Sequence, residues 1–205
     1  MPNQNLIKRV MKNSAKNIFI ISGPSGAGED SIIDGLAKFM PIERVVTTTT
    51  RQPRQGESEG NPYYFISKEK FEEKIAENGF VEYARQYNDN IYGVTFDEIE
   101  RVKNSGRIGI WKIEYKGVET AKKLFPGIIA IFITVESLSV LEDRLRRRGA
   151  SEEYIKERMV YTKEWFNHTD IYDYTVTNVE NKLDESIQKT ATIIQKHREE
   201  NGNKA

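Results

Sequence analysis

A glycine-rich segment near the start of the chain narrows the fold more than any other feature. Gly23-Pro-Ser-Gly-Ala-Gly28 follows a continuous apolar run, residues 17–22, and precedes a stretch with helical periodicity, residues 31–39. The apolar run is typical of a strand buried on both faces. Glycines in a strand-to-helix turn let backbone N–H groups converge on an anion, and the helix N-terminus adds positive potential. We therefore predict a phosphate-binding turn, with a tight turn capped by Asp30 or Ser31 as the alternative.

The residues after this turn depart from the usual phosphate-binding pattern. A P-loop continues with a lysine for the terminal phosphates and a Ser or Thr for Mg²⁺. Here Glu29 and Asp30 follow the last glycine, and Ser31 comes after them. The loop lacks its usual cation, so a phosphate-binding function needs positive charge from elsewhere in the chain.

Strand and helix patterns alternate along most of the chain. Further buried strands are predicted at residues 107–113, 128–135 and 174–178. Helical periodicity is present at residues 68–78, 95–104, 117–124, 137–148, 152–167 and 183–199. Strands separated by helices predict an α/β fold with a parallel sheet and right-handed crossovers.

Residues 47–93 do not follow this alternation of strand and helix patterns. Prolines and glycines separate short runs at residues 63–66 and 80–87, which predicts a small mixed β element inserted into the core. The length of 205 residues suits one domain with such an insert. The last residues, 201–205, are expected to form a frayed tail.

Composition excludes several classes of function. The net charge is zero, so nothing favours bulk attraction to nucleic acid or to a membrane surface. The absence of cysteine removes disulfides, thiolate metal sites and cysteine nucleophiles, and two histidines make a histidine metal site improbable. Residues 1–16 lack the apolar core of a secretory signal, and no run is long enough to cross a bilayer. A cytoplasmic location is the expectation.

A second motif lies downstream of the glycine-rich turn. Thr47-Thr-Thr-Thr-Arg51-Gln-Pro-Arg54-Gln-Gly-Glu57 is followed by Gly60 and Tyr63. Two arginines three residues apart, with a proline between them, can hold one phosphate through forked hydrogen bonds. A solvated basic loop would explain a single arginine, but it explains poorly the combination with a phosphate loop upstream.

This motif closely resembles the GMP-binding signature of guanylate kinases. The resemblance continues at residues 79–84, 92–93, 145–149 and 176–178 and covers residues 18–194. It implies an α/β fold with a three-layer, parallel-sheet P-loop kinase core, a small mixed β insert that binds GMP, and a helical lid. As a single domain, residues 1–205 would divide into a core at 17–46 and 94–200, an insert at 47–93 and a lid at 137–165.

The resemblance implies a GMP site in the insert. The implied GMP residues are Thr47, Arg51, Arg54, Tyr63, Glu82, Tyr92, Val94 and Glu114. Glu82 would face the base, because a carboxylate accepts from the guanine ring N–H and exocyclic amine, whereas adenine has an unprotonated ring nitrogen there. Val94 departs from the Ser or Thr that is usual after the Tyr-Gly pair, and Thr95 is the nearest substitute.

The resemblance also implies a donor site for ATP with Mg²⁺. The implied phosphate-binding residues are Gly23, Ser25, Gly26, Ala27, Gly28, Glu29, Asp30, Ser31 and Arg144, with Asn178 on the adenine side. Arg148 and Arg158 would join Arg51 in neutralising the transferring phosphoryl group when the lid closes. Asp30 would ligate Mg²⁺. ATP and GMP are the expected partners of a monomer or homodimer, without nucleic acid or membrane.

A second departure accompanies the missing lysine. The family has an Asp-x-Asp pair in its third core strand, and this chain has Lys112-Ile-Glu114. Strand residues two apart share a face, and the carboxyl end of a parallel strand carries the ligand site. We hypothesise that Lys112 reaches the ATP phosphates in place of the loop lysine, with Glu29 pairing Lys112 or another cation.

Three functions follow from these patterns. The leading one is guanylate kinase activity, from ATP and GMP (and dGMP) to ADP and GDP, within purine nucleotide metabolism. The second is a non-catalytic domain that binds GMP or a phosphorylated ligand, in which Lys112 and Glu29 form only a structural ion pair. The third is a nucleotide kinase with another acceptor, which the combination of Glu82 and Val94 leaves open.

Overall fold

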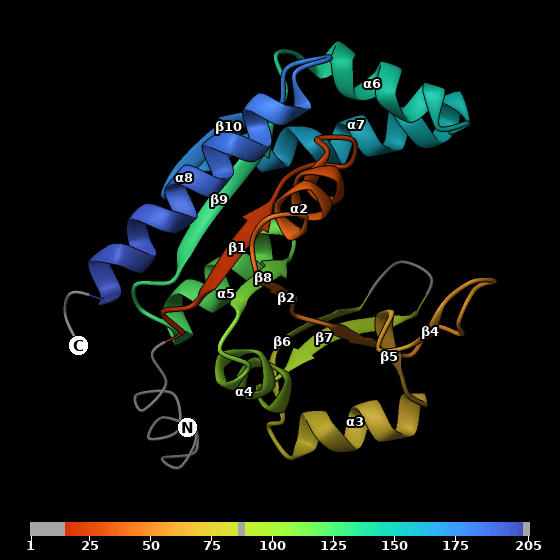
Figure 1. Cartoon of the computed structure of the whole chain (residues 1–205). Coiled ribbons are helices and arrows are strands. Elements are labelled where there is room, and N and C mark those ends of the chain that lie inside the picture. The colour runs from red at the N-terminus through yellow and green to blue at the C-terminus, as the bar shows by residue number, and fades with distance from the viewer. Residues whose placement is uncertain (1–14, 86–88, 203–205) are drawn as a thin grey trace. The chain divides into compact units, whose positions relative to one another are not determined.

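The computed structural model describes residues 15–85 and 89–202, whose elements are drawn in Figure 1. These residues form two compact units. The first unit comprises residues 15–18, 43–85, 89–111 and 119–128. The second unit comprises residues 19–42, 112–118 and 129–202.

The second unit contains parallel strands in the order β10, β9, β1. Their bounds are β1 Ile18–Ser22, β9 Ile129–Thr134 and β10 Tyr174–Thr177. The central strand β9 pairs in parallel with both neighbours, with Phe19 opposite Ile129 and Tyr174 opposite Ile131. Every residue of β1 is buried, as expected for a strand covered on both faces. The parallel sheet with its helices confirms the α/β class.

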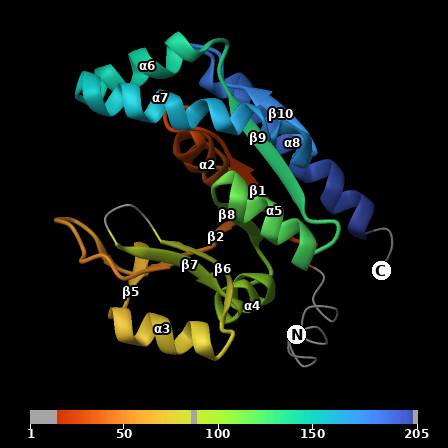
Figure 2. The same ribbon diagram turned by 180° about the vertical axis from the view of Figure 1, so that it is seen from behind.

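Helices cover both faces of these strands. They are α2 (Glu29–Ala37), α7 (Glu152–Phe166) and α8 (Leu183–Gly202). The unit also contains α6 (Leu138–Arg147), which packs against α7, and a short 3-10 helix at Thr169–Ile171. Figures 1 and 2 show α2 and α8 on one face and α7 on the other. Gly35 allows α2 and α8 to approach closely, because a Cβ there would collide with Ile187. On the other face, Trp165 of α7 stacks on Phe132 of β9, with ring centroids 6.4 Å apart.

The first unit is built on a mixed sheet, as predicted. Its strand order is β4, β5, β3, β7, β6, with bounds Ser58–Glu59, Pro62–Phe65, Thr47–Thr49, Ile91–Thr95 and Phe80–Arg85. β3 pairs in parallel with β5 and antiparallel with β7. Helix α3 (Lys68–Ala76) packs through Phe71, whose ring stacks on Phe80 at 4.2 Å.

The remaining elements are β2, α4, β8 and α5. Their bounds are Ile42–Arg44, Phe96–Asn104, Ile108–Lys112 and Tyr115–Leu124, and β8 is hydrogen-bonded to β2. Glu98 of α4 is nearly fully buried, with 2% of its side chain exposed, and it pairs with Arg101 at 2.8 Å. That pairing compensates the cost of burying the carboxylate.

Several predicted boundaries differ from the observed ones. Helix α2 begins at Glu29 rather than at residue 31, and α8 continues to Gly202, so the tail prediction was wrong for residues 201–202. The strands β2, β3, β4 and β7 were not predicted, because threonines, glycine or charges interrupt or replace their apolar pattern. Residues 1–14, 86–88 and 203–205 lie outside the described residues, and with them most of the N-terminal segment and the end of the predicted strand at 80–87.

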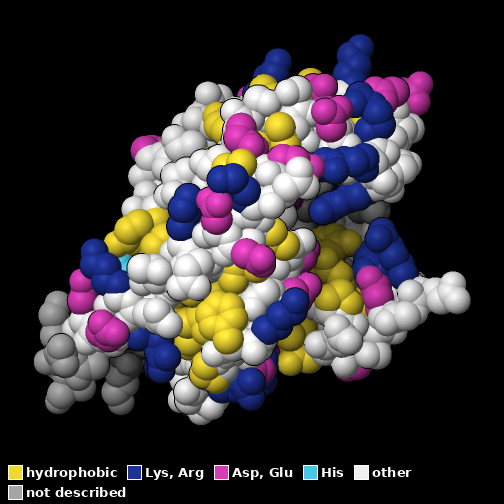
Figure 3. Space-filling view, turned by 45° about the horizontal axis from the view of Figure 1, so that its top comes forward, with side chains coloured by type: hydrophobic (Ala, Val, Ile, Leu, Met, Phe, Trp, Pro, Cys, Tyr) yellow, Lys and Arg dark blue, Asp and Glu magenta, His cyan; other side chains and the backbone are white. Residues whose placement is uncertain are grey.

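The surface bears charges of both signs. Figure 3 shows acidic and basic side chains interspersed over the face in view, as the zero net charge suggests. Among the described helices, none combines the length and apolar character that crossing a membrane requires.

Candidate active site

The predicted phosphate loop leaves β1 and leads into α2 in the second unit. Gly26 and Gly28 have φ angles of 94° and 98°, in the left-handed region that favours glycine. A Cβ at Gly23 would collide with the carbonyl of Ile133, and one at Gly28 with the side chain of Asn178. The glycines are therefore required both by the backbone conformation and by close packing against β9 and the end of β10.

Glu29, the first residue of α2, turns its carboxylate back onto the loop. Its Oε2 accepts a hydrogen bond from the backbone N–H of Gly28 at 3.1 Å. The residue as a whole keeps some exposure, but its carboxyl group is surrounded by protein atoms, and burial raises its pKa from 4.5 to about 7 in spite of nearby Lys112. The side chain thus uses a loop donor that a phosphate would otherwise receive.

Replacing Glu29 by glutamine is expected to change how the stability of the metal-free protein depends on pH. The pKa of Glu29 is about 7 in the folded protein and 4.5 as its ordinary value. The free energy of unfolding of the wild type therefore falls as pH rises from the ordinary pKa to the pKa in the folded protein. Above the pKa in the folded protein, it falls no further on account of Glu29. The free energy of unfolding of the variant, relative to that of the wild type, should increase by on the order of 1–3 kcal/mol as pH rises from about 5 to about 8.

Urea unfolding of both proteins across this pH range measures the difference. Asp34→Asn, which removes an exposed carboxylate from the same helix, serves as the charge-matched control and should give no comparable gain. A stability difference between Glu29→Gln and wild type that is independent of pH would contradict the prediction.

Lys112, the last residue of β8, lies beside the first turn of α2. Its Nζ is 2.7 Å from Asp30 Oδ2, and the two side chains are 45% and 61% exposed. An ion pair so exposed contributes at most about 1 kcal/mol, so it can open at little cost. The sequence suggested Glu29 as the partner of Lys112, whereas the ion pair given by the structure is with Asp30. A lysine distant in sequence thus places a cation at the end of the phosphate loop.

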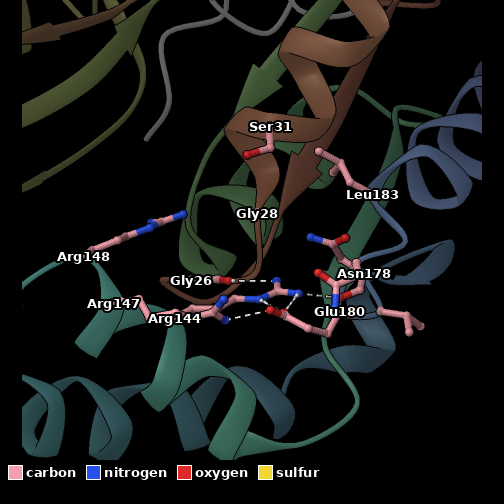
Figure 4. A pocket seen from close by; sticks show the side chains of 11 residues that line it. Gly26, Gly28, Ser31, Arg144, Arg147, Arg148, Asn178, Glu180 and Leu183 are labelled. Atoms are coloured by element: carbon pink, nitrogen blue, oxygen red, sulfur yellow. Dashed lines mark hydrogen bonds and ion pairs between the residues drawn. The ribbon is translucent and has the colours of Figure 1, made fainter.

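A pocket of about 300 Å³ adjoins the phosphate loop. Figure 4 shows that it is formed by the loop, helix α6 and the segment after β10. Of the predicted donor-site residues, it brings together Gly26, Gly28, Ser31, Arg144, Arg148 and Asn178. These six residues line one pocket, and their role in binding ATP stays a prediction.

Arg144 and Asn178 are both engaged with the protein. Arg144 Nη1 donates to the carbonyls of Gly26 and Ala27, each at 3.2 Å, and Nη2 donates to the carbonyl of Asn178 at 2.9 Å. The Asn178 side chain donates to the Ala27 carbonyl at 2.8 Å. Binding of ATP phosphate by Arg144, and of adenine by Asn178, stays a prediction. In the structure both side chains support the loop.

The other arginines with a predicted role in the lid are Arg148 and Arg158. Arg148 is exposed, and in Figure 4 it extends separately from Arg144. Arg158 lies on α7 and its Nε donates to the hydroxyl of Tyr154 at 3.0 Å. Arginines in these positions retain donors for an anionic ligand, because a guanidinium carries five N–H groups.

Glu114 lies in the second unit, whereas the other predicted GMP residues lie in the first. Its Oε2 accepts from the hydroxyl of Tyr161 on α7 at 2.8 Å. Burial and the Glu114 carboxylate raise the pKa of Tyr161, which therefore stays protonated as the donor. The structure thus links this carboxylate to the predicted lid.

In the first unit, Arg51 is held in a fixed orientation. Its Nη2 donates to both oxygens of Glu57, at 2.8 and 2.9 Å, and only 10% of its side chain is exposed. The guanidinium carbon lies 5.4 Å from the ring centroid of Tyr63. Hydrogen bonds to Glu57 and then Tyr92 raise the pKa of Arg51. Arg51, Tyr63 and Tyr92, predicted to bind one phosphate, therefore lie together.

Arg54 extends the same cluster through its backbone. Its N–H donates to Glu57 Oε2 at 2.7 Å, while its side chain is exposed. Glu57 thus ties both arginines of the motif into one loop conformation. Glu57 is part of the sequence motif, but no role was predicted for it, because residue spacing does not indicate which cation a carboxylate pairs with.

The predicted base contacts occupy different surroundings. Glu82 on β6 is half-buried and lies opposite Val94 on β7. Val94 is fully buried, and its apolar side chain has no group to hydrogen-bond a base. Thr95 is the N-cap of α4, where its hydroxyl accepts from Glu98 N–H at 3.2 Å. Thr95 is therefore committed to capping, while Thr47 on β3 is half-buried opposite Tyr63.

Comparisons with known proteins show which family this chain resembles. The family model described as Guanylate kinase matches residues 15–197. The guanylate kinase of Rickettsia felis is 40% identical over 184 residues, covering 89% of this chain and 94% of that protein. The guanylate kinase of Haemophilus influenzae is 39% identical over 189 residues, covering 90% of each. The crystal structure of guanylate kinase from Anaplasma phagocytophilum has a TM-score of 0.67 at 25% identity, covering 87% of this chain and 84% of that one.

A glycine-rich phosphate loop on a parallel sheet, with a separate arginine-bearing mixed sheet, defines a nucleoside monophosphate kinase. The family model spans most of the chain, and the relatives share more than a third of its residues. The chain belongs to the guanylate kinase family.

Proposed function

We propose that this protein transfers the γ-phosphoryl group of ATP to GMP, and also to dGMP, with Lys112 in place of the loop lysine. The observation that carries the proposal is the 2.7 Å ion pair between Lys112 and Asp30 at the first turn of α2. A four-carbon stem with a point charge at its end does not require one attachment point. Opening this exposed pair would free the ammonium for the donor phosphates.

The acceptor half of the proposal rests on the cluster around Arg51. Arg51, Arg54, Tyr63 and Tyr92 would hold the GMP phosphate. Glu57 keeps Arg51 oriented before any ligand arrives, which lowers the entropic cost of binding. Glu82 and Thr47 would face the base, and Glu114 would also bind GMP. Residues 47–93 would act as the acceptor-binding insert and residues 137–165 as the lid.

The reaction would be a direct displacement. A phosphate oxygen of GMP forms the new bond to the γ-phosphorus as the bond to the bridging oxygen of ADP breaks. No general base is required, because the attacking oxygen is already anionic. Lys112, Arg51, Arg148 and Arg158 would neutralise the charge on the transferring group, and lid closure would exclude water.

Magnesium fits the residues at the start of α2. Asp30 presents an exposed carboxylate beside the Ser31 hydroxyl, and both are hard oxygen donors suited to this ion. Asp30 would hold the ion together with the phosphate oxygens of ATP. When bound, the ion would neutralise charge on the β- and γ-phosphates.

A coupled assay that follows ADP formation tests the proposal. Full-length protein, ATP and Mg²⁺ are combined in turn with GMP, dGMP, AMP, UMP and CMP. Turnover with GMP and dGMP supports the proposal, and turnover only with another acceptor replaces GMP by that nucleotide. GMP binding without turnover favours the non-catalytic alternative, for which the contact of Glu29 with the loop N–H is the supporting observation.

A further inference from the structure

The guanidinium of Arg144 supports the outward side of the phosphate loop. Loop N–H groups that bind phosphate leave carbonyls on the other side, and buried carbonyls require donors of their own. Arg144 Nη1 donates to the carbonyls of Gly26 and Ala27, both at 3.2 Å. Its Nη2 donates to the carbonyl of Asn178 at 2.9 Å. Arg144, from helix α6, thereby joins the loop to the segment that follows β10.

Glu180 holds this arginine in place. Its Oε2 accepts from Arg144 Nε at 3.1 Å and lies 3.0 Å from Arg144 Nη2, as Figure 4 shows. Its Oε1 accepts from Arg147 Nη2 at 2.8 Å. The Arg144 side chain is 13% exposed. A guanidinium has five N–H donors, and four of those of Arg144 are used in hydrogen bonds within the protein, so that each of its three nitrogens is engaged.

We propose that Glu180 is a positioning residue for the donor nucleotide: it fixes Arg144 beneath the phosphate loop, so that the loop's N–H groups are already arranged when ATP binds. This inference rests on the proposed function, because it assigns the loop to ATP. It also gives Arg144 a supporting role in place of direct phosphate contact. A nearly buried guanidinium without its carboxylate would seek other partners, and the loop carbonyls would lose their donors.

The test compares Glu180→Gln with wild type in the full chain. The amide keeps the size and one acceptor oxygen but loses the charge. We expect the Kd for ATP, measured by calorimetry, to rise about tenfold, as for loss of one charge-assisted pair. The KM for GMP should stay within about twofold, since the acceptor site uses other residues. Glu180→Asp, which restores the carboxylate, should recover part of the ATP affinity.

A second readout needs neither nucleotide nor activity. Amide hydrogen exchange of peptides covering residues 23–28 should be faster in Glu180→Gln than in wild type, because a less supported loop opens more often. Glu152→Gln is the matched control. It breaks a comparable carboxylate–arginine pair, with Arg146 at 2.6 Å, on the exposed surface of the lid, and it should leave exchange and ATP affinity unchanged.

The outcomes separate this inference from the proposed function. Unchanged ATP affinity and unchanged loop exchange in Glu180→Gln overturn the positioning role, as does an equal loss of affinity for GMP. If wild type binds ATP but does not phosphorylate GMP, the proposed function fails, while the binding and exchange comparisons still decide the role of Glu180. If wild type does not bind ATP at all, both fail.

Discussion

Replacing Lys112 by alanine is expected to lower kcat for GMP phosphorylation by about 10²–10³-fold, the usual cost of removing a group that stabilises transition-state charge. Lys112 is the cation found beside Asp30 at the end of the phosphate loop, where the usual lysine has become Glu29. The variant should fold normally, because the exposed pair it removes contributes at most about 1 kcal/mol. Steady-state kinetics with saturating ATP and GMP measure the effect.

Lys116→Ala is the matched control for this experiment. Lys116 is an exposed lysine on the first turn of α5, and its Nζ lies 5.8 Å from the ring centroid of Tyr115. Its loss should change kcat by less than about twofold, since surface substitutions away from a site have small effects. Turnover of Lys112→Ala equal to that of wild type would remove Lys112 from the mechanism.

An exchange of charges sharpens the test. Lys112→Asp should be at least as impaired as Lys112→Ala, because it adds a negative charge near the phosphates. Combining it with Glu29→Lys restores the usual lysine directly after Gly28, while Asp30 stays in place of the usual Ser or Thr. If Lys112 does the work of a lysine at position 29, the double variant should regain most of the kcat that Lys112→Asp loses. If the fold-change in kcat of the double variant equals the product of the fold-changes of the two single variants, the two positions act independently.

Replacing Glu82 by glutamine is expected to lower kcat/KM for GMP by about 10²–10³-fold and to weaken the discrimination against AMP. A carboxylate accepts both N–H groups of guanine, whereas an amide presents one acceptor and one donor. The NH₂ group of the glutamine would face a guanine N–H, and neither of these two donors would have an acceptor. A site that hydrogen-bonds its substrate rejects analogues lacking that group by as much as about 10⁴–10⁵-fold. Wild type should therefore strongly prefer GMP, and the variant much less so.

The measurement compares kcat/KM for GMP and AMP in both proteins. Glu73→Gln, an exposed carboxylate on α3 in the same unit, is the matched control and should behave as wild type. Because Val94 has no polar group to offer, we expect Glu82 to carry more of the discrimination than it would with a serine or threonine opposite it. An unchanged ratio of GMP to AMP activity in Glu82→Gln would place base recognition elsewhere.

The local chemistry of the chain predicted most of the core. The apolar run before Gly23 predicted β1, and similar runs predicted β8, β9 and β10 within one or two residues at each end. Among the strands that escaped prediction, β3 consists of threonines, and β7 has a glycine in the middle of its apolar residues. Such segments form strands because neighbours supply hydrogen-bond partners, and a one-dimensional pattern does not reveal those neighbours.

The candidate site divides in the same way. The glycine-rich loop and the paired arginines are recognisable from sequence, because backbone freedom and donor spacing are local properties of the chain. The partners of these groups are not local. Lys112 and Asp30 are 82 residues apart, and Arg144 and Glu180 are 36 apart. Which carboxylate meets which cation depends on where strand and helix ends come together in the folded chain.

By itself, the sequence determined that the chain is an α/β protein with a phosphate loop lacking its lysine, and that an arginine pair lies in an inserted β segment. Only the tertiary structure decided that Lys112 pairs with Asp30, that Thr95 is used to cap α4, and that Arg144 supports the loop from its carbonyl side. Residue type sets what a side chain can bond, and packing sets which of the possible partners lies within reach.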